Sequence, residues 1–341
     1  MAKRLGSNTI QCETRPRILA SAGVAGKREA AGPLGARFDR IFDDTAMDED
    51  SWEKAESRLL LCAAEIALEK AKLEPRAIQA VFAGDLQSQC TASVFGLRGL
   101  GVPYAGIFGA CSTMAEGLLL AALAIESGGF SLTMAATASH FCTAERQFRH
   151  PLEYGGQRTP TAQWTVTGAG AALLAKEADP HAPLIDKVQL GTMVDLGVTD
   201  AGNMGAAMAP AAKKTIADFL RDTNTTPDDY DLILTGDLGA VGSDLLHELM
   251  RREEGIDLEK NHRDCGVLIY DRETQDVHSG GSGCGCSASV LCCDMIRCLR
   301  EGSLSNILFV ATGALMSATS SKQGESIPGI AHAVLLKRGE G

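Results

Sequence analysis

The chain reads Phe108-Gly109-Ala110-Cys111-Ser112-Thr113 where a short apolar segment, 104–108, meets a longer one, 112–125. The longer segment has almost no polar face, which predicts a buried helix, and the shorter one predicts a strand. The small residues at the junction permit a sharp turn. A cysteine therefore stands directly after a strand, at the start of a buried helix.

The pattern around this junction occurs twice along the chain. The matching stretches are Gly84-Asp85-Leu86 with Gly236-Asp237-Leu238, Ala110-Cys111-Ser112 with Gly285-Cys286-Ser287, Glu126 with Glu301, and Ala136-Thr137 with Ala311-Thr312. Several matches in the same order predict two halves of related fold, 1–180 and 181–341, joined near Pro180-His181-Ala182-Pro183. A duplicated fold of this kind usually places one site at the interface of its halves.

Short apolar strands alternate with helical patterns, which indicates an α/β fold. The spacing of apolar residues predicts a helix over 52–67 that Asp50 or Ser51 can cap. Strands are predicted at 80–83 and 132–138, on either side of the Cys111 junction.

The composition excludes several classes of protein. The 341 residues are 45% hydrophobic and 22% charged, as in an ordinary globular protein. The net charge of −11 gives no electrostatic footprint for nucleic acid. The longest apolar run, 118–125, is too short to cross a bilayer, and the N-terminus has no secretory signal. An odd count of 11 cysteines does not indicate a disulfide framework, so we expect reduced thiols.

Cys111 is the first candidate for chemistry. The amides and dipole of the helix that follows it favour a thiolate there, or would hold a ligand carboxylate. The alternative is a buried structural cysteine, which is the commonest fate of a free thiol.

Charged and polar residues follow the strand at 132–138. His140 comes first, and then Arg146 and Arg149, whose guanidinium groups would suit a carboxylate clamp. The alternative is a solvated loop with an internal pair between Glu145 and Arg149.

Two further motifs have structural alternatives. Asp85 and Asp237 occupy equivalent turns, where Gly-Asp is common for conformational reasons. The glycine-rich loop 280–286 lacks the lysine of a phosphate loop, and the spacing of its cysteines does not fit a zinc ribbon. We therefore predict no metal site, and small-residue packing of this loop against the other half.

Several longer stretches carry a family resemblance. They are Ala31-Gly-Pro-Leu-Gly35, Phe82-Ala-Gly-Asp-Leu86, 97–113, Thr143-Ala-Glu-Arg-Gln-Phe-Arg149, Glu153-Tyr-Gly-Gly-Gln157, Thr225-Thr-Pro-Asp-Asp-Tyr-Asp231, Gly280-Gly-Ser-Gly-Cys284 and Glu325-Ser-Ile-Pro328. With its two Cys-Ser junctions, the chain resembles the thiolase superfamily, which includes the ketoacyl synthases. Within it, the chain is similar to the stage V sporulation protein AD family of spore-forming bacteria. The resemblance implies a duplicated five-layer αβαβα fold, usually dimeric.

The resemblance also implies a function. Members of this family are expected to bind dipicolinic acid (pyridine-2,6-dicarboxylate), for its uptake into the forespore and its release at germination, together with the stage V sporulation protein A membrane proteins. The pocket residues that we carry over or select are Asp85, Cys111, Ser112, His140, Arg146, Arg149, Gly281 and Ser282. No cofactor is expected, and calcium only together with the ligand.

An enzyme similar to ketoacyl synthase III needs a histidine and an asparagine beside its cysteine, to stabilise an oxyanion. The histidine is expected after the strand 232–235, where this chain has Gly236-Asp237, and the asparagine in the glycine loop, where it has Gly281-Ser282. We therefore expect a binding protein and not an enzyme. The alternatives are an acyltransferase that uses Cys111 with another base, or a structural subunit with a vestigial pocket.

The expected location is the cytoplasmic side of the spore inner membrane. Without a signal peptide or membrane-spanning segment, the chain would associate there peripherally, through its partner proteins. A homodimer is expected from the family.

Overall fold

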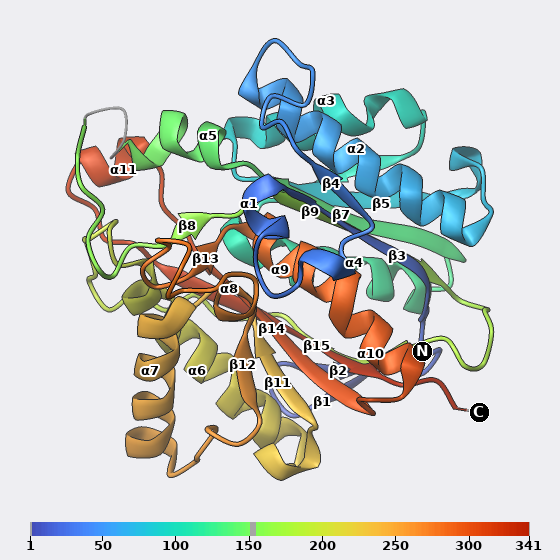
Figure 1. Ribbon diagram of the computed structural model, residues 1–341. Coiled ribbons are helices and arrows are strands. Elements are labelled where there is room, and N and C mark those ends of the chain that lie inside the picture. The colour runs from blue at the N-terminus through green and yellow to red at the C-terminus, as the bar shows by residue number, and fades with distance from the viewer. Residues whose placement is uncertain (1, 151–154, 341) are drawn as a thin grey trace.

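The chain folds into alternating strands and helices over residues 2–150 and 155–340, which are those that the computed structural model describes (Figure 1). The first half builds a sheet in the order β3-β9-β7-β5-β6. Its strands are β3 Arg17–Gly26, β5 Ala80–Gly84, β6 Tyr104–Gly106, β7 Leu132–Ser139 and β9 Gly168–Ala175. Strand β9 runs antiparallel to both β3 and β7, whereas β5 runs parallel to β7 and β6.

The second half repeats this topology in the order β10-β15-β14-β11-β12, and one antiparallel contact between β10 and β3 links it to the first. Its strands are β10 Leu184–Gln189, β11 Leu232–Thr235, β12 His262–Asp264, β14 Asn306–Ala314 and β15 Gly329–Lys337. Strand β15 runs antiparallel to β10 and β14, and β11 runs parallel to β14 and β12. Each strand thus has its counterpart, at the same place and in the same direction, which confirms the duplication predicted from the repeated motifs.

The helices complete five layers, αβαβα, as the resemblance predicts. Helix α2 (Trp52–Ala71) covers the outer face of the first sheet, and α6 (Met204–Thr223) that of the second (Figure 1). Between the sheets lie α4 (Thr113–Glu126) and α9 (Cys284–Val290), the latter continued through a π-helical turn into α10 (Ile296–Glu301). The remaining helices are α1 Lys27–Ala30, α3 Thr91–Leu97, α5 Phe141–Ala144, α7 Gly239–Leu249, α8 Cys265–Leu268 and α11 Ala318–Lys322.

Short strands sit outside this repeat. They are β1 Lys3–Leu5, β2 Thr9–Gln11, β4 Arg40–Phe42, β8 Trp164–Thr165 and β13 Gly281–Ser282. Strand β2 pairs with β10, so the first residues of the chain add to the sheet of the second half. The boundary near residue 180 stays a prediction; it falls between β9 and β10.

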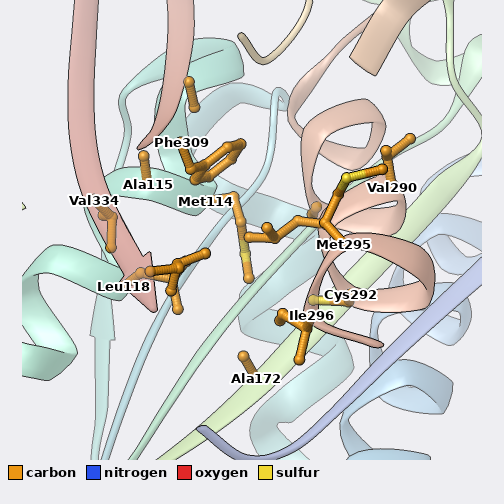
Figure 2. Packing of buried hydrophobic residues seen from close by; sticks show 14 of the residues in the cluster. Met114, Ala115, Leu118, Ala172, Val290, Cys292, Met295, Ile296, Phe309 and Val334 are labelled. Carbon is orange, nitrogen blue, oxygen red and sulfur yellow. The ribbon is translucent and has the colours of Figure 1, made fainter. Parts of the chain in front are cut away.

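Burial follows the layers. Over the described residues, one hydrophobic cluster lies under α2, one under α6 and one between the two sheets. In the central cluster, Met114 and Leu118 of α4 lie near Met295 and Ile296, across from Phe309 of β14 (Figure 2). Each large apolar side chain buried in this way contributes about 1.5–3 kcal/mol. The central helices therefore join the halves through an apolar core.

The small residues of α9 let this helix approach the first sheet closely. A Cβ atom at Gly170 of β9 would lie 2.9 Å from the Cβ of Ala288 and closer still to the carbonyl group of that residue. Gly23, the register partner of Gly170 on β3, faces the backbone oxygen of Ser289 in the same way. This confirms the predicted packing of the cysteine-rich segment against the other half. Its thiols Cys284, Cys286, Cys292 and Cys293 are buried.

Individual elements agree with the sequence to within a few residues. Helix α2 begins at Trp52, and the hydroxyl of Ser51 caps it by accepting from the amide of Lys54. In the part of the chain that the structure describes, no helix is both long and apolar enough to reach across a bilayer.

Candidate functional site

A cavity of about 370 Å³ opens at Cys111. Its lining comes from both halves: Leu86, Gln87, Ser88, Gln89, Phe108, Ala110, Cys111, Gln147, Phe148, Arg149, Met204, Ala314, Met316, Ser317, Ala318 and Thr319. Of the lining residues that the structure describes, only Arg149 has a charged side chain. The predicted interface site therefore exists as a cavity with a single cationic group on its wall.

The Cys111 turn is held by close backbone contacts. Residues Ala110–Ser112 form one 3-10 turn before α4, and Ala110 takes the left-handed conformation at φ 50°. The hydroxyl of Ser112 donates to the carbonyl of Gly109 at 2.6 Å, so this side chain serves the turn and not the cavity. Gly313 of β14 lets the turn approach, because a Cβ there would lie 3.2 Å from the amide nitrogen of Ser112.

Asp237 is the partner of Cys111 that the sequence did not assign to the site. Its buried carboxylate accepts from the hydroxyl of Ser282 at 3.0 Å, the amide of Gly283 at 2.8 Å and the hydroxyl of Thr312 at 3.0 Å, and its charge acts on the nearby Cys111 thiol. Burial raises the pKa of Asp237, and burial together with this carboxylate raises the pKa of Cys111. These effects favour a neutral thiol, in line with the alternative of a buried structural cysteine.

A second buried acid fixes the turn that carries Asp237. Asp264 accepts from the backbone amides of Leu238 at 2.8 Å and Gly239 at 3.0 Å, and from the hydroxyl of Thr235 at 2.7 Å. Burial raises the pKa of Asp264 to about 7. These bonds hold the start of α7 against β12, so Asp237 is presented to Cys111 by a constrained backbone.

Arg149 reaches the cavity from the π-helical turn Glu145–Arg149 that continues α5. Its Nη1 donates to the carbonyl of Gln163 at 2.6 Å, and its Nε is buried without a partner. Within the described ranges, no carboxylate lies within salt-bridge distance of this guanidinium. Burial lowers the pKa of Arg149, while the acidic neighbours raise it. The segment Glu145–Arg149, for which a solvated loop was the alternative, thus forms a helix end that places the Arg149 guanidinium at the cavity.

Arg146 lies outside the cavity. Its guanidinium donates to both carboxylate oxygens of Glu53, at 2.7 and 2.8 Å, and its side chain is 56% exposed. Residues three apart share a face of an α-helix, but the wider π-helical turn rotates Arg146 and Arg149 onto different faces. The structure therefore does not bring the two predicted arginines together.

His140 and Asp85 are buried away from the cavity wall. The His140 ring bonds to the carbonyl of Thr45 at 2.9 Å and accepts from the amide of Cys142 at 3.1 Å, and burial lowers its pKa. Asp85 accepts from the amides of Gln87 at 2.9 Å and Ser93 at 2.7 Å. Both contact patterns fit a role in local structure, which for Asp85 was the alternative that the sequence offered.

Gly281 and Ser282 form β13, which pairs with β8. Gly281 accepts from the amide of Gln163 at 2.9 Å, and Ser282 holds Asp237. Neither residue lines the cavity at Cys111.

A smaller cavity of about 150 Å³ adjoins the first. The two share the wall formed by Phe148, Arg149, Met204 and Met316. Arg158 and Gln163 line the smaller one, and the sequence did not select either of them. The available signal was the position of Arg158 directly after Gly155-Gly156-Gln157, part of which carried the family resemblance. Residues 153 and 154 of that stretch lie outside the described residues.

No cluster of three or more His, Cys, Asp or Glu side chains that could hold a metal ion occurs over 2–150 and 155–340. Two buried thiols of the second half instead donate to backbone carbonyls. The thiol of Cys284, for example, donates to the carbonyl of Ala138 at 2.9 Å.

The fold and the site can now be compared with known proteins. 3-oxoacyl-acyl-carrier-protein synthase III from Aquifex aeolicus VF5 superposes with a TM-score of 0.58 at 16% identity, covering 94% of this chain and 99% of that one. A variant of OleA from Xanthomonas campestris gives a TM-score of 0.60 at 15% identity, covering 98% and 100%. At such low identity the likeness shows a thiolase-like fold and nothing about activity.

Sequence relationships are more specific. Stage V sporulation protein AD of Bacillus subtilis (strain 168) is 45% identical over 327 residues, which cover 96% of each chain. The family model of stage V sporulation protein AD (SpoVAD) matches residues 6–337. The chain belongs to the stage V sporulation protein AD family.

Proposed function

We propose that this protein binds dipicolinic acid without catalysing a reaction, and serves its uptake into the forespore and its release at germination. The observation that carries the proposal is the cavity at Cys111, whose charged lining consists of Arg149 among the described residues. A cationic group on the wall of a cavity favours an anion, and a guanidinium suits a carboxylate because its donors form a fixed fork.

The rest of the cavity suits a planar aromatic acid. Its volume of about 370 Å³ falls in the range of small-molecule sites. Phe148, Met204 and Met316 supply apolar surface for a ring, and methionine adapts readily to aromatic surfaces. Polar side chains such as Gln87 and Ser317 line the same cavity and provide further hydrogen-bonding groups.

The surroundings of Cys111 support binding over catalysis. Nucleophilic catalysis needs a thiolate and an oriented base, whereas burial and the nearby Asp237 carboxylate raise the pKa of this thiol. An anionic acceptor would repel an oxyanion that developed beside it. We infer that the inherited catalytic position now forms the floor of a binding site.

Calcium, if it binds, enters with the ligand in this proposal. The charged lining residue is a cation, which disfavours a free metal ion, whereas dipicolinate itself offers oxygen ligands of the kind that calcium prefers.

Isothermal titration of the protein with dipicolinate, in the presence and absence of calcium, tests the function. We expect saturable binding of one ligand per chain. The absence of heat at millimolar ligand would contradict the proposal. Incubation with an acyl-CoA followed by intact-mass analysis tests the alternative function. An acyl adduct on the wild-type protein that is absent from Cys111→Ala would support an acyltransferase.

We also propose that a second copy of the chain pairs at strand β6. This strand ends the sheet and pairs with β5, and its three residues are exposed. Phe95 and Phe108, which are 53% and 50% exposed, lie close to it in the chain. An unpaired apolar sheet edge is a template for pairing with another chain. Sedimentation velocity is expected to give the mass of a dimer, and a monomer at micromolar concentration would contradict this.

The proposed place of this dimer is the spore inner membrane, docked on the stage V sporulation protein A membrane proteins. Membership of a sporulation family supports this proposal. Co-purification with spore membranes that depends on those proteins would test it.

A further inference from the structure

Three residues that line the smaller cavity each carry a buried polar atom that has no partner in the described part of the chain. These atoms are Nε of Arg149, Nη1 of Arg158 and Oε1 of Gln163. Buried polar atoms are normally paired, and three unpaired ones on residues that line one cavity therefore point to a ligand.

The Gln163 side chain is fixed by its own bonds. Its Nε2 donates to the carbonyl of Asp237 at 2.6 Å and to that of Gly281 at 2.9 Å. A flipped amide would place an oxygen against both carbonyls, so the orientation is set. Gln163, which is 4% exposed, thus keeps an unused acceptor at the cavity.

Arg158 is fixed in a similar way, with one nitrogen left over. Its Nη2 donates to the backbone oxygen of Asp276 at 2.8 Å and to the carboxylate at 3.2 Å. The guanidinium also lies over the ring of Trp164, 4.8 Å from its centroid. The Arg158 side chain is 9% exposed, whereas that of Asp276 is 77% exposed, so solvent screens this pair. The positive charge of Arg158 is therefore only partly compensated.

The charges on the lining leave room for one anion. Arg149 and Arg158 contribute two positive charges, and Glu145 is the acid among the described lining residues. Since Arg149 also serves the larger cavity, the cation that the smaller cavity adds is Arg158, which suits one further carboxylate. Gln163 can accept from a water molecule or a protonated oxygen beside it.

We propose that the smaller cavity is a second carboxylate subsite and that Arg158 is the residue that makes the site prefer dicarboxylates to monocarboxylates. One carboxylate lies at Arg149 in the larger cavity, and the other enters the smaller cavity toward Arg158, past the wall that the two share. This inference rests on the proposed function and adds the residue that selects a second carboxylate on the ligand.

Titration of wild type and Arg158→Gln with two ligands of the same ring tests the subsite. The ligands are dipicolinate and pyridine-2-carboxylate, which lacks one carboxylate. We expect Arg158→Gln to weaken dipicolinate about 10- to 100-fold, the range of a charged hydrogen bond, and to leave pyridine-2-carboxylate within about threefold of wild type. Arg158→Lys, which keeps the charge but loses the fork, is expected to fall between the two.

The control is Arg251→Gln. Arg251 is an exposed arginine that pairs with Glu259 and lines neither cavity. This variant loses the same charge and is expected to bind both ligands as wild type does. If Arg158→Gln weakened the binding of both ligands equally, Arg158 would be acting on any anion through its charge at a distance. That result would overturn the proposed subsite. Unchanged binding of dipicolinate in that folded variant would also overturn it, while the proposed function would stand. A wild-type protein that binds no dipicolinate would overturn both.

Discussion

Replacing Arg149 with glutamine is expected to weaken dipicolinate binding by about 100-fold, because removing one partner of a buried charge pair costs several kcal/mol. Arg149 lines both cavities, whereas Arg158 lines only the smaller one. The loss is therefore expected to exceed that of Arg158→Gln, and to extend to pyridine-2-carboxylate, which Arg158→Gln spares.

The thermal stability of the ligand-free Arg149→Gln variant is not expected to fall with its affinity. Burial lowers the pKa of Arg149, which means that the empty site holds its charge at a cost. Glutamine removes that charge, so the apo protein is expected to melt no lower than wild type. Isothermal titration and thermal unfolding of the same sample check both halves of this prediction.

Arg146→Gln is the matched comparison, three residues away on the same helical segment. Its partner is Glu53, and a half-exposed ion pair of this kind contributes little. We expect nearly unchanged affinity. If Arg146→Gln abolished binding while Arg149→Gln did not, the assignment of the cavity as the site would be wrong.

The different positions of Arg146 and Arg149 could not be predicted from the sequence. The sequence placed both after strand β7 and predicted a clamp, but it held no signal for a π-helical turn, which depends on how the segment packs. Arg158 and Gln163 were missed for a related reason: they lie in an irregular segment without periodicity, and only the fold brings them to Arg149.

The fold was predictable because the same sequence motifs occur in both halves of the chain. Repeated Gly-Asp-Leu and Cys-Ser motifs marked equivalent strand ends, and the two sheets repeat one strand order. For Asp237 the repeat gave a wrong expectation, because the shared motif predicted the same local turn role for Asp85 and Asp237. Asp85 bonds to amides within its own turn, whereas Asp237 reaches Ser282, Gly283 and Thr312 on other elements. Copies of a turn can acquire different partners, and those partners are visible only in three dimensions.

Replacing Gly170 with valine is expected to destabilise the fold by on the order of 3 kcal/mol or more, since it overpacks a dry interface against backbone atoms. The backbone at this position would accept a side chain; the obstacle is space. The nearest obstacles belong to the backbone of Ala288, which cannot rotate away, and Gly23 receives the same helix on the neighbouring strand. The helix α9 would have to lift from the sheet.

Thermal unfolding and soluble yield measure this effect. Gly99→Val is the control, because a Cβ at Gly99 would meet no atom within 4 Å. A Gly170→Val protein that melted like wild type would show that α9 does not pack on β9 as described.

The smaller change Gly170→Ala connects this interface to the site. The amide of Gly283, at the start of α9, donates to Asp237 at 2.8 Å, and the next residue, Cys284, contacts the carbonyl of Ala138. A helix displaced by a single methyl group would shift the donor that holds the partner of Cys111. We therefore expect Gly170→Ala to lower both the melting temperature and the affinity for dipicolinate, although residue 170 lines neither cavity. A lower melting temperature with unchanged affinity would mean that Asp237 keeps its position independently of α9.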